Sequence, residues 1–137
     1  MSDHRIIRIL LLEDNPDDLF LLRAALSKVQ THHFALFQAD RLKDAVELLR
    51  EQPVDVVLAD LHLPDSAGLD TVKNLVRNSD SVPIIVLTGY DDEALGATAL
   101  TEGAFGFLSK DDFNSPRLPQ AIDRAVSSKQ HPRSQSK

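Results

Sequence analysis

The chain has 137 residues, enough to bury the core of one domain without disulfides or a structural metal. It contains no cysteine, which excludes disulfide frameworks, cysteine metal sites and thiol nucleophiles. Its 15 basic and 21 acidic residues give a net charge of -6, which disfavours a nucleic-acid surface. No apolar run approaches the ~20 residues that cross a bilayer, and the polar start from Met1 to Arg5 is unlike a signal peptide. We therefore expect a cytoplasmic protein that does not enter the membrane.

Apolar runs of strand length alternate with segments of helical period, which predicts a parallel sheet covered on both faces. Pro16 suits the first turn of the first helix, Asp40 is the expected cap of the second, and Gly103 stops the fourth. The polar end of the chain predicts a domain over residues 1–128 and a frayed tail over 129–137. The expected strands are 8–12, 34–39, 54–60, 82–88 and 106–109, and the expected helices begin near 16 and span 42–50, 69–77, 92–101 and 118–128.

Charged or hydroxyl-bearing side chains close four of the five strands. Glu13 and Asp14 follow the first strand, Asp60 ends the third, Thr88 ends the fourth, and Lys110 follows the fifth. In an open parallel sheet, functional groups gather outside the carboxyl ends of the strands, so these side chains should meet at one edge. Three adjacent carboxylates repel one another unless a hard cation neutralises them, and Mg²⁺ prefers carboxylate oxygen and water. The edge therefore predicts a Mg²⁺ site, with Glu13 and Asp14 as ligands directly or through water.

The same groups are suited to phosphoryl transfer. A carboxylate can attack phosphorus and form an aspartyl phosphate, and Asp60 is the candidate nucleophile because its strand is central. The Lys110 ammonium would hold one phosphoryl oxygen, and the Thr88 hydroxyl would bond another. Asp17 and Asp18 are interpreted only as acids that favour the start of the first helix electrostatically.

Four short motifs carry a family resemblance. They are Leu-Leu-Glu-Asp-Asn at 11–15, Asp60 with Leu63-Pro64 and Gly68 after it, Pro83 to Gly89, and Gly103-Ala104 ahead of Phe107 and Lys110. In this order and spacing the chain resembles the receiver domain of bacterial two-component response regulators, over about Ile7 to Ser128. The resemblance implies a doubly wound, flavodoxin-like α/β sheet in the order 2-1-3-4-5.

The resemblance also implies a function. Asp60 would accept a phosphoryl group from a histidine kinase or a phosphotransfer protein, with Mg²⁺ bound by Asp14, Asp60 and the main-chain carbonyl of His62. Thr88 would move toward the phosphoryl group while Phe107 turns inward, and the output would pass to an unknown protein target. Such a domain is a switch rather than an enzyme, capable at most of Mg²⁺-dependent self-phosphorylation and slow self-dephosphorylation.

Three positions depart from the receiver pattern. Asp111 replaces the proline that usually follows the lysine, so the cis bond expected at that joint is absent. His62 and Tyr90 occupy the two positions that flank the phosphoryl group in receivers. Their bulk predicts a hindered attacking water and a longer phosphorylated lifetime.

Three other functions are compatible with an α/β fold of this size. A flavin-phosphate binder would need a glycine-rich or hydroxyl-rich first turn, whereas Glu13-Asp14-Asn15-Pro16 would repel phosphate. An aspartate-nucleophile phosphohydrolase would carry its nucleophile on the first strand with a second acid two residues later, which this turn does not match. A receiver-like interaction module that works without phosphorylation remains the alternative, although such a form is expected to have lost an acid, the threonine or the lysine.

Overall fold

Five parallel strands form the central sheet of the computed structural model, which describes residues 6–89 and 92–130. Their order across the sheet confirms the expected 2-1-3-4-5 arrangement, because the fourth and fifth strands of this sheet are β6 and β7. Each neighbouring pair is parallel. From one edge to the other the strands are β2 (His33–Ala39), β1 (Ile6–Leu12), β3 (Val56–Asp60), β6 (Ile84–Thr88) and β7 (Gly106–Ser109).

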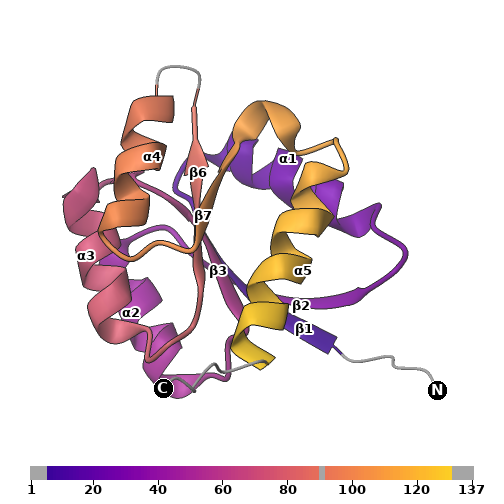
Figure 1. Ribbon diagram of the computed structural model, residues 1–137, viewed down its shortest axis with the longest axis horizontal. Coiled ribbons are helices and arrows are strands. Elements are labelled where there is room, and N and C mark those ends of the chain that lie inside the picture. The colour runs from indigo at the N-terminus through magenta and orange to yellow at the C-terminus, as the bar shows by residue number, and fades with distance from the viewer. Residues whose placement is uncertain (1–5, 90–91, 131–137) are drawn as a thin grey trace.

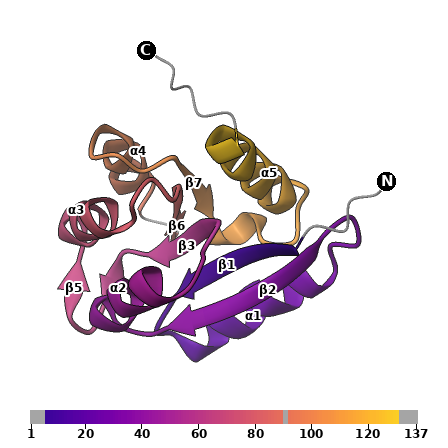
Figure 2. The same cartoon turned by 90° about the horizontal axis from the view of Figure 1, so that it is seen from below.

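Helices cover both faces of the sheet (Figures 1 and 2). One face carries α1 (Pro16–Ser27) and α5 (Arg117–Gln130), and the other carries α2 (Leu42–Glu51), α3 (Leu69–Asn78) and α4 (Glu93–Thr101). This three-layer α/β arrangement is the doubly wound fold that the alternating pattern predicts. Within the described residues, no helix is both long and apolar enough to cross a membrane.

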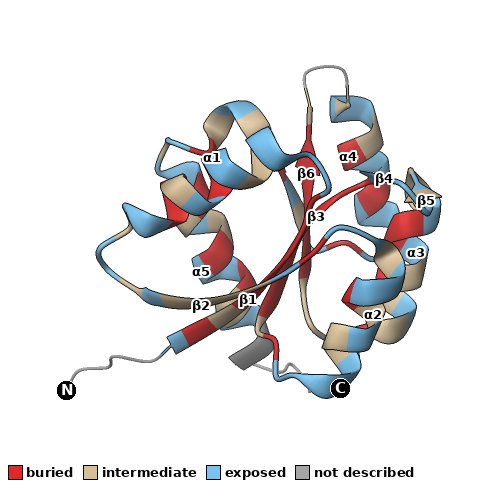
Figure 3. Ribbon diagram, turned by 180° about the vertical axis from the view of Figure 1, so that it is seen from behind, coloured by how far each residue is buried: buried red, intermediate tan, exposed pale blue. Residues whose placement is uncertain are grey.

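The alternation of side chains along the strands divides the core into two halves. Ile9 and Leu11 of β1 pack with the residues of α1 and α5, whereas Leu10 and Leu12 pack with those of α2, α3 and α4. β3 is buried at every position, since it lies in the centre of the sheet and is covered on both sides (Figure 3). Continuous burial explains why the sequences of β3 and β6 are almost unbroken apolar runs.

The first helix begins where the sequence predicts, but the second has a different cap from the predicted one. The side chain of Asn15 accepts the N–H groups of Asp17 and Asp18 at 2.9 and 3.1 Å, so α1 begins at Pro16 as expected. The prediction that Asp40 caps the second helix is wrong. The carboxylate of Asp65 caps that helix instead, accepting the N–H groups of Leu42 and Lys43 at 2.8 and 3.1 Å. A cap supplied from a distant loop leaves no local sequence signal.

The loops contain two features that the sequence pattern did not predict. A two-stranded hairpin of β4 (His62–Leu63) and β5 (Ser66–Ala67) follows β3, and the loop after β7 is a 3₁₀ turn over Lys110–Asp112. The Ser109 hydroxyl accepts the N–H of Asp111 at 3.1 Å in that turn. β3 begins at Val56, two residues later than expected. Just before it, the N–H of Arg8 is bonded by the Asp55 side chain at 2.8 Å rather than by a backbone carbonyl.

Candidate functional site

The carboxyl ends of the central strands bring three of the expected residues together. Glu13 follows β1, Asp60 ends β3, and Lys110 follows β7, and because the strands are parallel all three side chains reach the same edge. Glu13 and Asp60 are buried, with exposed fractions of 2% and 7%, and the Lys110 side chain retains 19%. A buried pair of acids with a single ammonium is a charged site rather than a solvated strand terminus.

The Lys110 ammonium is the centre of this site. Its Nζ lies 2.9 Å from Glu13 Oε1, 2.6 Å from Asp18 Oδ2 and 2.9 Å from Asp60 Oδ2. The other oxygen of Asp60, Oδ1, accepts the N–H of His62 at 2.9 Å. Both oxygens of Asp60 are therefore held in place, which fixes the orientation of its carboxylate.

Asp18 has a role that the sequence interpretation missed. That interpretation gave it only a favourable interaction with the start of α1, but the structure also places it on Lys110. The cause is the Asn15 cap, which fixes the first turn of α1 directly after the acidic end of β1. A local signal could have identified Asp18. It stands three residues after the helix cap Asn15, and Asn15 directly follows the acidic end of β1.

The environment sets different ionisation behaviour for the two buried acids. Burial raises the pKa of Glu13 to about 7, with a further contribution from Asp60 and an incomplete offset from Lys110. Burial also acts to raise the pKa of Asp60, but the His62 N–H and the Lys110 ammonium outweigh it and hold that pKa below its ordinary value. Burial acts to lower the pKa of Lys110, but its contacts with Asp18, Asp60 and Glu13 keep that pKa above the usual value. Asp60 is thus the ionised acid beside a charged lysine.

The donor set fits a divalent cation. Among the described residues, the acids whose oxygens lie within 4.8 Å of one another are Glu13, Asp18 and Asp60. Glu13 Oε1 is buried and has no aligned hydrogen-bond donor, because Lys110 Nζ approaches it outside hydrogen-bonding geometry. Up to three negative charges face one ammonium, and oxygen ligands of this kind suit Mg²⁺. Asp14 is exposed and is not a member of this close cluster, although it lines a hollow together with Glu13.

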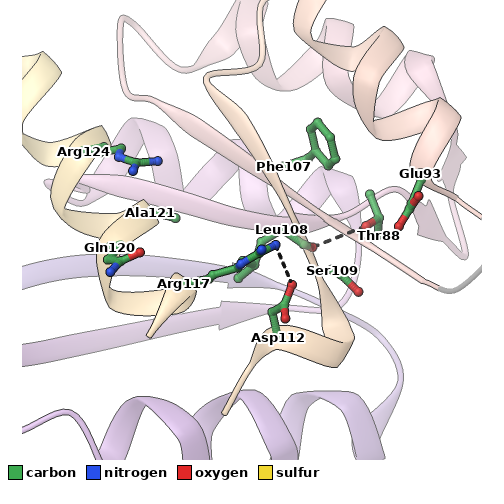
Figure 4. Close-up of a pocket in the computed structure, with 10 residues that line it drawn as sticks. All are labelled: Thr88, Glu93, Phe107, Leu108, Ser109, Asp112, Arg117, Gln120, Ala121 and Arg124. Carbon is green, nitrogen blue, oxygen red and sulfur yellow. Dashed lines mark hydrogen bonds and ion pairs between the residues drawn. The ribbon is translucent and has the colours of Figure 1, made fainter. Parts of the chain in front are cut away.

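Thr88 ends β6 next to β3, and Phe107 lies on the neighbouring strand β7. Thr88 is buried, and its hydroxyl donates to the Leu108 carbonyl at 3.5 Å, a long hydrogen bond. Phe107 retains 40% exposure, so it is not an ordinary core residue. Figure 4 shows both side chains among those that line a pocket between α4, β7 and α5, where Arg117 reaches Asp112 at 3.5 Å.

Of the two residues expected to tune the phosphorylated lifetime, the structure describes only His62, which begins β4 just after the end of β3. His62 is half exposed, and its Nε2 lies 3.4 Å from Asp92 Oδ2, so it links the β4–β5 hairpin to the start of α4. Tyr90 lies outside the described residues.

Comparison with known proteins identifies the family. Residues 9–123 match the family described as the response regulator receiver domain. The chain belongs to this family. Receiver domains are parts of two-component signalling systems and are generally not enzymes.

Individual relatives agree with this assignment. The domain is 30% identical over 105 residues to the protein PilH of Pseudomonas aeruginosa, covering 75% of this chain and 84% of PilH. It is 34% identical over 103 residues to the response regulator PilR of the same organism, covering 75% of this chain and 22% of PilR. The chain therefore spans about a fifth of PilR, and it covers 52% of YdfI from Bacillus subtilis.

Solved structures show the same fold. A signal receiver domain of an HD domain-containing protein from Pseudomonas fluorescens superposes with a TM-score of 0.81 and 28% identity, covering 99% of this chain and 97% of that one. The receiver domain of the sensor histidine kinase PA1611 from Pseudomonas aeruginosa has a TM-score of 0.72 and 25% identity, covering 90% and 100%. That second structure holds a magnesium ion in its active-site cleft.

The raised pKa of Glu13 makes the stability of this receiver domain depend on pH in the absence of metal. The pKa is about 7 in the folded state against an ordinary value of 4.5, so the stabilisation from protonated Glu13 is complete below about pH 4.5 and is lost as the pH rises through 7. We expect the free energy of unfolding, measured by urea titration in EDTA, to fall by up to about 3 kcal/mol over that interval. Glu13→Gln should remove most of the fall, whereas Glu47→Gln on the exposed face of α2 should retain it. Equal pH profiles for wild type and Glu13→Gln would contradict the assignment.

Proposed function

We propose that this receiver domain is a phosphorylatable switch that accepts a phosphoryl group on Asp60 from a histidine kinase or a phosphotransfer protein. The observation that carries the proposal is the ionised Asp60 carboxylate, oriented through one oxygen by the His62 N–H and through the other by the Lys110 ammonium. An oxygen of Asp60 forms a bond to phosphorus as the bond from phosphorus to the donor histidine nitrogen breaks. That nitrogen keeps the electron pair and takes up a proton.

The side chains around Asp60 have distinct tasks in this step. Lys110 lies 2.9 Å from Asp60, so its ammonium is in place to bind an oxygen of the incoming phosphoryl group. Asp14, Asp60 and the main-chain carbonyl of His62 would hold Mg²⁺, with Glu13 as a further ligand directly or through water. When bound, the metal offsets the charge that three acids and a phosphoryl group bring together. The magnesium ion in the related PA1611 receiver supports this assignment.

The signal would leave the site through Thr88 and Phe107. In the present structure the Thr88 hydroxyl faces the Leu108 carbonyl, and Phe107 is 40% exposed. Binding of the hydroxyl to a phosphoryl oxygen would take it away from Leu108, and inward movement of Phe107 would reshape the pocket between α4, β7 and α5. A local change in charge would thereby bias a two-state surface that a downstream protein reads.

Phosphorylation of Asp60 is tested by incubating the protein with acetyl phosphate and Mg²⁺ and measuring the intact mass. We expect the mass of one phosphoryl group to be gained, and no gain for Asp60→Asn, because an amide cannot replace the carboxylate nucleophile. Asp55→Asn is a matched control just before the start of β3, at the opposite end from Asp60, and should still gain the group. No gain in the wild type, and no spectral response to beryllofluoride, would favour an interaction module that works without phosphorylation.

The metal assignment predicts which acids control Mg²⁺ affinity. Asp14→Ala and Asp60→Asn should each weaken Mg²⁺ binding by about tenfold or more, measured by isothermal titration calorimetry at constant pH. Asp17→Ala removes the same charge from the first turn of α1 but should leave the affinity nearly unchanged. Equal affinities for Asp14→Ala and Asp17→Ala would show that Asp14 acts only through its charge and is not a ligand.

The bulky residues at positions 62 and 90 predict a long-lived phosphorylated state. His62→Asn and Tyr90→Glu should each shorten the half-life of phosphorylated Asp60 several-fold, because smaller or acidic side chains there would admit or orient the attacking water. The half-life is read from the decay of the phosphorylated mass after excess acetyl phosphate is removed. His33→Asn, on β2 at the opposite end of the strands, is the control. Rapid decay in the wild type that neither substitution changes would contradict the role of both side chains.

A further inference from the structure

Gly96 is a buried glycine in the interior of α4, a helix of nine residues. Glycine is among the poorest helix formers, so a short helix gains nothing locally from it. Its N–H donates to the Asp92 carbonyl at 2.9 Å, which shows that the backbone there is ordinary helix. The reason for glycine at this position must therefore lie in what α4 packs against.

The space that a side chain at position 96 would need is already occupied by the two residues of the proposed switch. A Cβ atom on Gly96 would lie 2.7 Å from Thr88 Cγ2 and 3.0 Å from both Cγ and Cδ2 of Phe107. Carbon atoms in good contact are about 3.5–4.0 Å apart, so the methyl group of an alanine would overlap with both side chains. The backbone of α4 at Gly96 thus packs directly on Thr88 and Phe107 together.

The shape of threonine makes this contact sensitive to the state of the switch. Cγ2 and the hydroxyl of Thr88 are both bonded to Cβ, so rotation about χ1 moves the two groups as a unit. The hydroxyl cannot turn from the Leu108 carbonyl toward a phosphoryl group on Asp60 without moving the methyl off Gly96. The gap that results must be filled by the Phe107 ring or by a shift of α4, because packed interiors do not tolerate voids of this size.

We propose that Gly96 is a positioning residue that couples α4 to Thr88 and Phe107. Its missing side chain allows direct contact in the resting state, and the same contact transmits a rotation of Thr88 to the helix. The proposal rests on the switch function described above. It assigns to α4 a specific point of contact with Thr88 and with Phe107, which is a large apolar residue that is 40% exposed.

The first test follows the two switch side chains by NMR, with labelled threonine methyl and phenylalanine ring groups, in wild type and Gly96→Ala. We expect the Thr88 methyl and Phe107 ring resonances of the variant to be displaced before any activation. The further shift that beryllofluoride and Mg²⁺ induce at these groups should fall to less than half of the wild-type shift. Gly106→Ala is the matched control, because it makes the same change next to Phe107 at a position where a Cβ meets nothing within 4 Å. Wild-type resonances and a wild-type response in Gly96→Ala would overturn the proposal.

Thermal unfolding gives a second test, in which the direction of the change in Tm decides between two explanations. Helix propensity alone predicts that Gly96→Ala raises the Tm, and Ala97→Gly, on the exposed face of the same helix, calibrates that effect. The overlap with Thr88 and Phe107 predicts a lower Tm instead. Thr88→Ser removes Cγ2 and keeps the hydroxyl, so Gly96→Ala should cost less in that background and should there regain part of the beryllofluoride response. A raised Tm in Gly96→Ala, or equal losses in the two backgrounds, would overturn the proposal.

The two proposals fail in distinguishable ways. Gly96 is not part of the acidic site, so Gly96→Ala should still gain the mass of a phosphoryl group from acetyl phosphate. A phosphorylated wild type with an unchanged response in Gly96→Ala would remove only the role of Gly96. A wild type that gains no phosphoryl group and does not respond to beryllofluoride would remove the switch itself.

Discussion

The interaction on which the site depends is the contact of one ammonium group with three carboxylates. Lys110 follows the last strand of the sheet, yet its Nζ lies within 3 Å of acids from β3, from the loop after β1 and from the first turn of α1. It ties together segments that are 50 to 97 residues apart in sequence. The attraction offsets part of the cost of burying Glu13 and Asp60, and the remaining negative charge is of the kind that a divalent cation would neutralise.

This arrangement follows from the parallel sheet and its two covered faces. Every position of β3 and β6 is buried between the two apolar halves of the core, and the polar residues of these strands, Asp60 and Thr88, stand at their ends. Parallel strands end at the same edge, which places Glu13 and Asp60 side by side. Burial acts to raise the pKa of both acids, but the hydrogen bonds from the His62 N–H and Lys110 hold the pKa of Asp60 below its ordinary value, whereas the pKa of Glu13 stays raised.

Packing joins Thr88, at the acidic edge, to α4 and β7. Thr88 ends β6 at the acidic edge, and its methyl group lies against Gly96 on α4 together with the ring of Phe107. A phenylalanine has no hydroxyl, so Phe107 contacts its neighbours here by packing alone. The absence of a side chain on Gly96 makes the packed space common to the helix, Thr88 and Phe107.

The sequence by itself determined the fold class and the set of Glu13, Asp60, Thr88 and Lys110, because buried strands read as apolar runs and polar residues mark their ends. The strand order came from the resemblance of its motifs to receiver domains. Only the tertiary structure decided three other features, namely the contact of Asp18 with Lys110, the capping of α2 by Asp65, and the packing of Gly96 on Thr88 and Phe107. Local sequence patterns show the period of the apolar residues and the residues that end helices and strands. Each of those contacts instead joins residues from separate elements, and their distances exist only after the helices have packed on the sheet.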